Sequence, residues 1–234
     1  MERPDLVIAG VGNASGGVYN LVKIAGHGKL HGDIDCIDFN IQGNATIHGN
    51  VKAKVTHISG RAHMIGTLRS EQIKIQGNAS IHGDIECKEI RFHGRGDVKG
   101  NVMAEEVCIH GETEIVGDCA AEVFDASGSF TIGGLLNAGN IHIKLFGNCR
   151  AKEIGGEKIE VKQQGMTFFK KLFLHVGLTA ESIEGDEIYV EHTKANVVRG
   201  NRVTIGPGCD IELVEYKDAF QCDKGAKVGS YKKI

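Results

Sequence analysis

Histidines are the residues of this chain whose type and spacing could support chemistry at a metal ion. The 234 residues include 11 histidines; His31, His48 and His82 recur at a 17-residue interval or twice that interval, and His93 and His110 recur at the single interval. Imidazole is a common ligand of zinc, but a zinc site needs three or four ligands that converge on one point. Whether these side chains converge depends on the elements that the spacing builds.

A 17-residue repeat sets that spacing. From Ile73 to Ala121 the chain reads IKIQGNASIHGDIECKE, then IRFHGRGDVKGNVMAEE, then VCIHGETEIVGDCAA. Apolar or small residues alternate with polar ones, which is the period of a β-strand. Two Gly-polar pairs in each copy, such as Gly77-Asn78 and Gly83-Asp84, fit corners because these residues tolerate turn dihedrals. A unit of three strands and three corners predicts an all-β parallel β-helix, a solenoid of triangular cross-section with 17-residue turns.

Two columns of glycines show how far the repeat extends. The first corner column comprises Gly26, Gly43, Gly60, Gly77, Gly94, Gly111 and Gly128, and the second comprises Gly32, Gly49, Gly66, Gly83, Gly100, Gly117 and Gly134. The regular pattern decays between positions 155 and 162, where Ile159 and Val161 resume the phase only after one inserted residue. Further on, Ile183 and Val198 are separated by a 15-residue step, which predicts about two more turns with a shorter rung.

This pattern divides the chain into five parts. We expect a leader at 1–17, a β-helix domain at 18–162, an apolar and basic connecting segment at 163–179, an additional short β-rich segment at 180–216, and a charged tail at 217–234. Within the connecting segment, the run from Phe168 to Phe173 has two readings. It is either a loop or short helix packed on the coil, or an interfacial membrane anchor formed by Phe168, Phe169, Lys170, Lys171, Leu172 and Phe173.

Composition excludes several classes of protein. The net charge of -3 gives no argument for a nucleic-acid partner. Seven cysteines without a CxxC motif favour neither a zinc ribbon nor a thioredoxin-like site. Cys36 and Cys87 share a column but lie three turns apart, about 14 Å at the spacing of strands, which is too far for a disulfide. No signal peptide or run of transmembrane length is evident, so we expect a reduced, cytoplasmic protein.

The repeat also decides how the histidines are read. Successive rungs are about 4.8 Å apart, so His31 and His48 could share a metal. However, Ile65 interrupts their column, and the spacing fixes no carboxylate as a second-shell partner. There is no Ser-His-Asp order, P-loop or dinucleotide fingerprint. We therefore expect no catalytic, cofactor or metal site. Two alternatives remain: a left-handed-type β-helix enzyme, either an acyltransferase or a zinc carbonic anhydrase, and a monomeric β-helix binding module.

Tandem glycine units carry a family resemblance. Gly28-Lys29-Leu30-His31-Gly32-Asp33-Ile34 and Ala79-Ser80-Ile81-His82-Gly83-Asp84-Ile85 resemble the bactofilins, bacterial polymer-forming cytoskeletal proteins, and the resemblance covers roughly residues 18–161. It implies a right-handed β-helix, a hand that the spacing alone does not fix. It also implies a non-enzymatic scaffold that assembles end to end, without nucleotide, into non-polar filaments supporting cell-envelope, motility or morphogenesis machinery. The Pro-rich tails usual in that family are nearly missing here.

A coil of stacked strands ends in unpaired backbone groups and an exposed slice of core, so its ends are templates for another copy. We expect one contact at the first predicted turn and the other where the regular coil ends, with contact residues Val22, Ile24, Leu30, Ile34, Ile141, Ile143, Ile159 and Val161. The expected partner is the chain itself. A membrane surface at the inner face of the cell membrane and cell-envelope or flagellar proteins are further expected partners.

Overall fold

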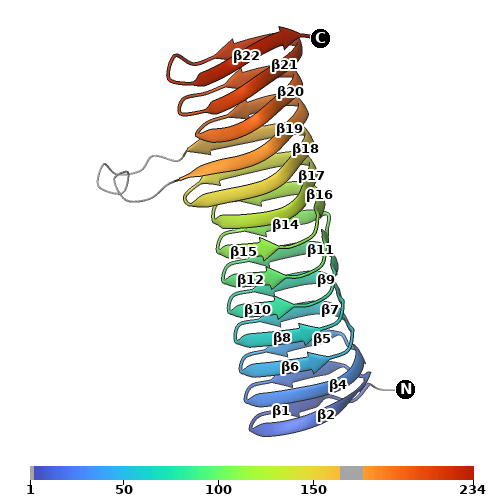
Figure 1. Cartoon of the computed structure of the whole chain (residues 1–234). Coiled ribbons are helices and arrows are strands. Elements are labelled where there is room, and N and C mark those ends of the chain that lie inside the picture. Colours follow the sequence, from blue (N-terminus) through green and yellow to red (C-terminus); the bar gives the residue numbers. More distant parts are fainter. Residues whose placement is uncertain (1–2, 164–175) are drawn as a thin grey trace. The chain divides into compact units, whose positions relative to one another are not determined.

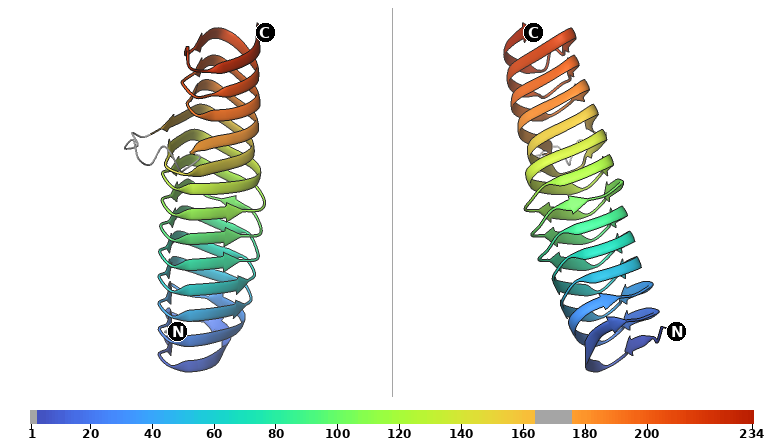
Figure 2. Two further views of the ribbon diagram at one scale, coloured as in Figure 1. Left: turned by 60° about the vertical axis from the view of Figure 1, so that its left-hand side comes forward. Right: turned by 90° about the vertical axis from the view of Figure 1, so that its right-hand side faces the viewer.

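The computed structural model describes residues 3–163 and 176–234. Those ranges contain 22 β-strands and no helix, which confirms the all-β fold predicted from the alternation of polar and apolar residues. The chain divides into two compact units, residues 1–117 and 118–234. In Figure 1 the strands of each unit are stacked one on the next, and Figure 2 shows the same stacking from two other sides.

Fifteen strands form the first unit, and they are short because corners interrupt them. They are β1 (Leu6–Ile8), β2 (Val11–Val18), β3 (Leu21–Ile24), β4 (His27–Asp35), β5 (Asp38–Ile41), β6 (Asn44–His48), β7 (Val51–Ile58), β8 (Arg61–Ile65), β9 (Leu68–Ile75), β10 (Asn78–Ile81), β11 (Ile85–Phe92), β12 (Arg95–Val98), β13 (Val102–Met103), β14 (Glu106–Ile109) and β15 (Glu112–Ile115).

Parallel pairing between successive rungs follows the 17-residue repeat. Phe39 lies opposite Thr56, and Thr56 lies opposite Ile73. Equivalent apolar side chains therefore stack on the inside of the coil, where Ile41, Ile58 and Ile75 are fully buried. The core consists of such columns of Ile, Val, Leu and Phe, and the 17-residue parallel β-helix predicted from the sequence is confirmed.

Glycine is required at the corners because successive rungs approach closely there. A Cβ on Gly60 would lie 2.0 Å from the carbonyl oxygen of Gly43, far inside van der Waals contact. At the second corner, Gly49 has φ 146°, in the region that side chains rarely adopt. These two constraints explain why glycine recurs in both columns.

The polar residue after the second corner glycine joins one rung to the next. Asp33 Oδ1 accepts a 2.7 Å hydrogen bond from the backbone N–H of Asn50, and Asn50 Oδ1 accepts one of 2.9 Å from the N–H of Thr67. Asp84 receives the same bond from Asn101 at 2.7 Å. The Gly-Asp and Gly-Asn pairs thus satisfy backbone donors that the corner would leave without a strand partner.

The expected leader is a rung of the coil. β1 pairs in parallel with β3, and β2 pairs with β4. The rung is one residue shorter than the repeat, since Leu6 lies opposite Val22, and an irregularity between Ser15 and Gly17 restores the 17-residue phase. This shortened register and the scarcity of large apolar residues in β2 hide the rung from the repeat pattern.

Seven strands form the second unit, and five of them have 13 to 17 residues. They are β16 (Cys119–Ala126), β17 (Ser129–Leu145), β18 (Asn148–Gln163), β19 (Gly177–Val190), β20 (Thr193–Ile205), β21 (Asp210–Cys222) and β22 (Lys227–Lys233). Each pairs in parallel with the next, from β16–β17 to β21–β22. The expected β-rich segment and charged tail are therefore strands that continue the coil of this unit.

Rung length varies within the second unit. Ile141 lies opposite Ile159, an 18-residue step that confirms the predicted insertion of one residue. Ile183 lies opposite Val198, which confirms the predicted 15-residue spacing. The apolar columns remain continuous because changes of length are absorbed at irregularities, as between Ile132 and Leu135.

Candidate assembly edges and side-chain clusters

The first rung has an open edge. Among residues 3–163 and 176–234, β1 is paired only with β3 and β2 only with β4, so one side of each strand has no partner strand. Leu6 continues an inward column and is half-buried, whereas its neighbour in the next rung, Val22, is fully buried. Outward-facing Val7 and Val11 are 56% and 90% exposed. Apolar side chains and unpaired backbone groups thus lie together here.

The last rung has the same property in the second unit. Within the described part of the chain, β22 is paired only with β21. Tyr231 lies opposite Val214, which is fully buried, so the tyrosine occupies an inward column, yet it is 63% exposed. Its ring centroid is 5.0 Å from that of Phe220, which in turn lies 5.5 Å from the ring of Tyr216. This rung ends in an accessible aromatic cluster.

The contact residues expected from the sequence lie one or more rungs inside these edges. Val22, Ile24, Leu30 and Ile34 are at most 2% exposed because β1 and β2 cover their strands, and Ile141, Ile143, Ile159 and Val161 are at most 1% exposed. In the second unit, Ile159 and Val161 are covered by Ile188 and Val190 of β19. The expected membrane residues Phe168, Phe169, Lys170, Lys171, Leu172 and Phe173 lie outside the described residues.

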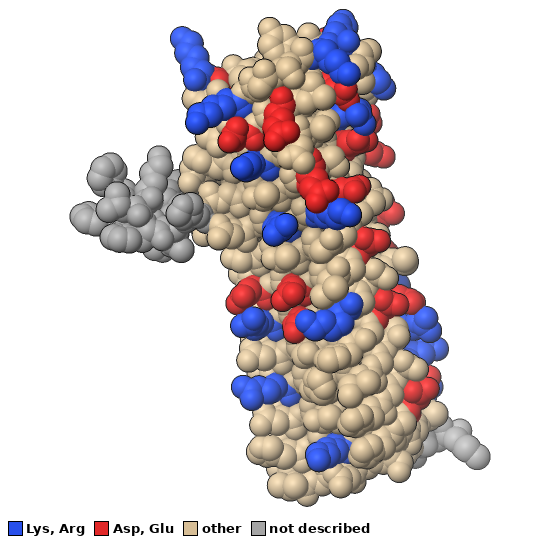
Figure 3. All heavy atoms as spheres, in the orientation of Figure 1, with Lys and Arg blue, Asp and Glu red and all other residues tan. Residues whose placement is uncertain are grey.

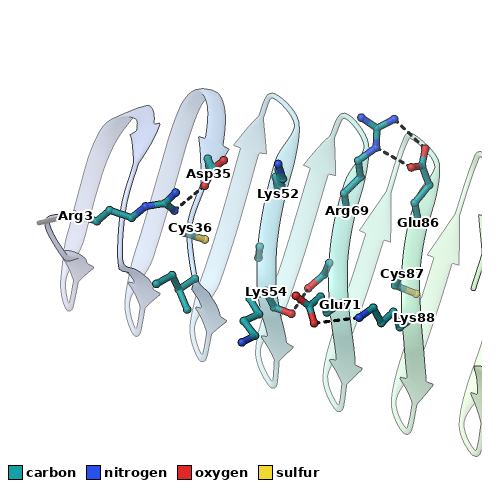
Figure 4. A pocket seen from close by; sticks show the side chains of 13 residues that line it. Arg3, Asp35, Cys36, Lys52, Lys54, Arg69, Glu71, Glu86, Cys87 and Lys88 are labelled. Atoms are coloured by element: carbon teal, nitrogen blue, oxygen red, sulfur yellow. Dashed lines mark hydrogen bonds and ion pairs between the residues drawn. The ribbon is translucent and has the colours of Figure 1, made fainter. Parts of the chain in front are cut away.

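A groove of about 620 Å³ runs over four rungs of the first unit (Figure 4). Its floor is a column of small residues, Cys36, Ala53, Ser70 and Cys87, and charged side chains from the positions before and after them form its walls. Arg69 donates two hydrogen bonds to Glu86, at 2.8 and 2.9 Å, and Lys88 lies 3.5 Å from Glu71. Most of the charged side chains that line the groove are therefore already in ion pairs.

The cysteines of this groove are poor nucleophiles. Burial, reinforced by nearby Asp35, raises the pKa of the Cys36 thiol to about 12, and burial with the charge of Glu89 raises the pKa of Cys87 to about 12. Because the thiolate is the reactive form, neither thiol fits a catalytic role at neutral pH. Cys36 and Cys87 form no disulfide with any described residue.

The histidines stack in pairs. The rings of His31 and His48 lie 5.2 Å apart and nearly parallel, and those of His93 and His110 lie 5.0 Å apart. Partial burial, with the charge of His110 a lesser cause, lowers the pKa of His93 below its usual value. His82 does not join the first pair. In the described ranges, no three His, Cys, Asp or Glu side chains converge as a metal site would require.

Comparison with known proteins identifies the family. The family model of bactofilin, described as polymer-forming cytoskeletal, matches residues 4–94 and 53–137, which together cover more than half of the chain. The chain belongs to the bactofilin family. The resemblance seen in the sequence is thereby confirmed, and the family's description is that of a structural, cytoskeletal protein. Among residues 3–163 and 176–234, no helix has the length and apolar character of a membrane span.

Two bacterial proteins resemble parts of this bactofilin. YhbE of Bacillus subtilis (strain 168) is 47% identical over 105 residues, which are 44% of this chain and 44% of YhbE. YhbF of the same organism is 41% identical over 102 residues, or 43% and 42% of the two chains. The matches thus cover less than half of each relative, and both relatives are described as uncharacterized proteins. No solved structure matches the chain.

Sequence reasoning missed the residues at the two open edges. Inward Leu6 and Ile8 flank the outward Val7, which is the alternation of a strand. The segment lacks the Gly-polar pairs that marked the corners of other rungs. Tyr231 follows Val214 at the 17-residue interval of the repeat, and this interval could have placed the tail in the coil. The alternation and the interval were the available signals.

Proposed function

We propose that this bactofilin is a non-enzymatic scaffold that assembles end to end, without nucleotide, into non-polar filaments. The observation that carries the proposal is the pair of open edges at β1–β2 and at β22, where strands with unpaired backbone groups adjoin accessible apolar side chains. Such edges are templates for further strand pairing. The family's polymer-forming description supports the same conclusion.

Non-polar filaments require two different contacts, each made between identical ends. In an isologous contact the first rung of one copy meets the first rung of another, and the last rungs meet separately. We place the first contact on β1 and β2 and the second on β22, in preference to the buried positions expected from the sequence. Ile24→Arg would bury a charge in the core, so it would report on folding and not on assembly.

Variants blocked at one end separate the possible modes of assembly. Wild type purified without nucleotide should form filaments of uniform width in negative-stain electron micrographs and should sediment as a polymer. Leu6→Arg places a charge on the first rung's inward column and should leave dimers joined through β22. Leu6→Arg combined with Tyr231→Arg should leave monomers. Val55→Arg, at an exposed outward position of β7, a strand paired on both sides, is the matched control and should still polymerise.

The outcomes decide between models. If Leu6→Arg alone yields monomers, the contact joins unlike ends and the filament is polar. If wild type is a monodisperse monomer, the scaffold proposal fails and the monomeric binding module becomes the better reading. Circular dichroism of each variant separates loss of assembly from loss of folding.

We also propose that the polymer works in the cytoplasm, at the inner face of the membrane, in support of cell-envelope, motility or morphogenesis machinery. The apolar and basic sequence from Phe168 to Phe173 supports a weak interfacial contact that many copies in a polymer would strengthen. Filaments should float with vesicles containing anionic lipid, and Lys170→Glu with Lys171→Glu should reduce flotation. Equal flotation of the variant would remove this segment from the proposal.

A further inference from the structure

The outer face of β4, β6 and β8 in the first unit contains a depression of about 230 Å³. Outward-pointing polar side chains from these three successive strands form most of its walls, and Val11, Gly12 and Asn13 of β2 complete the lining. The parallel register sets them in two columns, His27–Asn44–Arg61 and Lys29–Thr46–His63. Between the columns lie Gly28 and Ala45, which are inward positions and add no side chain to the outer face.

The depression is cationic. Lys29 and Arg61 are exposed, and neither forms an ion pair with any described residue. No Asp or Glu is among the described residues that line the depression. Figure 3 shows blue side chains without adjacent red ones at the lower left of the molecule, where strands of this unit lie. Two positive charges without a carboxylate partner favour an anionic ligand.

The same columns are neutralised two rungs further along. Arg95 occupies the column of Arg61, and its guanidinium lies 3.8 Å from a carboxylate oxygen of Glu112. Lys99 lies 2.8 Å from Asp97, which occupies the column of His63. Acidic partners are therefore present further along this face, whereas none of them lines the depression.

The donors of the depression suit an oxyanion with several acceptor atoms. Arg61 offers a planar fork of N–H groups, Lys29 offers an ammonium group, and Thr46 offers a hydroxyl. Asn44 Nδ2 lies 3.2 Å from His27 Nε2, which keeps these two side chains together on one wall. The donors project from both walls and from three rungs spaced about 4.8 Å apart. A carboxylate with two oxygens would reach fewer of them than a tetrahedral phosphate.

We propose that this depression binds a phosphate group, either free or as the monoester of a small molecule. Arg61 binds two phosphate oxygens through its fork, and Lys29 balances the remaining charge from the opposite wall. Asn44, Thr46 and the two imidazoles orient the group. All the donors belong to one copy of the chain, so the site does not require a polymer, and β2, which carries the proposed first contact, adds only Val11, Gly12 and Asn13 to its lining.

Equilibrium dialysis tests the site in the full-length protein, whether or not it polymerises. Radiolabelled inorganic phosphate is the first probe and O-phosphoserine is the second, both at low ionic strength. Wild type should bind one equivalent per chain. Lys29→Gln and Arg61→Gln should each weaken binding by about fivefold, the upper effect of an exposed ion pair, and the double variant should bind neither probe measurably.

Matched controls come from the same face. Arg95→Gln removes an arginine from the same column as Arg61, and Lys99→Gln removes a nearby lysine; both should bind like wild type. Tighter binding of O-phosphoserine would identify a monoester as the ligand, and equal binding of both probes would identify the bare phosphate group. Absence of saturable binding by wild type, or equal weakening by the controls, would overturn the proposal. Unchanged thermal unfolding of the variants shows that they are folded.

Discussion

The two units of this bactofilin build the same kind of coil with different corners. In the first unit, glycines close the corners at a 17-residue spacing from the second rung onward, and no strand exceeds 9 residues. In the second unit, strands of up to 17 residues run through the bends. The spacing between paired positions is 15 between β19 and β20, 18 or 19 between β17 and β18, and 29 between β18 and β19. Both units keep continuous apolar columns inside. A parallel β-helix therefore requires an unbroken core, whereas its corners and rung length can vary.

The difference has a physical cause. Corner backbones of the first unit are so close that a Cβ on Gly60 would lie 2.0 Å from a carbonyl oxygen. The second unit has a shorter glycine column that is less crowded. A Cβ on Gly185 would lie 2.5 Å from the carbonyl oxygen of Gly156. The first corner column of the first unit thus depends on glycine more strictly than the glycine column of the second unit, and the two columns should respond differently to the same substitution.

Gly60→Ala should produce the largest loss of stability. The new methyl group overlaps the carbonyl oxygen of Gly43, and the backbone of two rungs must move to relieve it. We expect a loss of about 3 kcal/mol in the free energy of unfolding. Urea denaturation followed by circular dichroism measures it. Gly10→Ala is the control, since no atom lies within 4 Å of the position that its methyl group would take, and it should leave stability unchanged.

Gly185→Ala should have a smaller effect. Its methyl group would approach the Gly156 carbonyl at 2.5 Å and the Cδ1 of Ile159 at 3.1 Å, and the isoleucine end can move. We expect the free energy of unfolding to fall by about 1–2 kcal/mol, the usual cost of overpacking. If the urea midpoint falls as far as in Gly60→Ala, the two kinds of corner are equally strict and the comparison fails.

Charge also distinguishes the units. Glu215 is buried in the second unit, where Lys232 at 2.7 Å and Arg199 bind its carboxylate and hold its pKa below the ordinary 4.5. Because the folded state favours the ionised form, this stabilisation is present above the ordinary pKa and is lost as pH falls through the lowered one. Glu215→Gln should lower the melting temperature at pH 7, and its difference from wild type should shrink in acid.

An exposed carboxylate of the first unit is the matched control for that experiment. Glu112 lies 3.8 Å from Arg95, and both side chains are largely exposed. Since solvent screens such pairs, Glu112→Gln should change the melting temperature little at any pH. A pH-dependent effect as large as that of Glu215→Gln would mean that burial does not set the difference.

Thiol labelling should distinguish buried cysteines from exposed ones in the native protein, without any substitution. Burial raises the pKa of Cys209 to about 11 and that of Cys36 to about 12, whereas Cys222 at the end of β21 is exposed. Iodoacetamide at neutral pH should therefore modify Cys222 in the native protein and reach the other two only after unfolding. Mass spectrometry of tryptic peptides measures this, and early labelling of Cys209 would show that the second unit opens readily.

The interior of the coil could be predicted from the sequence because its signals are local. Alternating side chains indicated the strands, and the column glycines indicated the corners. Even the irregular steps were visible, as in the inserted residue before Ile159 and the 15-residue interval from Ile183 to Val198. Each of these signals lies within one rung or between two successive rungs.

The surfaces could not be predicted in the same way. The first rung was missed because it follows a 16-residue register and because β2 carries glycine where other rungs carry leucine or isoleucine. That error moved the expected assembly residues, such as Val22 and Leu30, into positions that the structure buries. The cationic depression is formed by side chains of several rungs, and no Asp or Glu is among the described residues that line it. A pattern within a single repeat contains neither kind of information.

The rung-to-rung bonds from Asp33 to Asn50 and from Asn50 to Thr67 also bear on how the chain acquires its structure. Every such bond, like every strand pair in the first unit, joins a rung only to its immediate neighbour. A nascent chain can therefore complete and lock one rung for each repeat that leaves the ribosome, without waiting for distant sequence. Folding in the order of synthesis then leaves two edges without a partner strand at any moment, the open first rung and the growing rung.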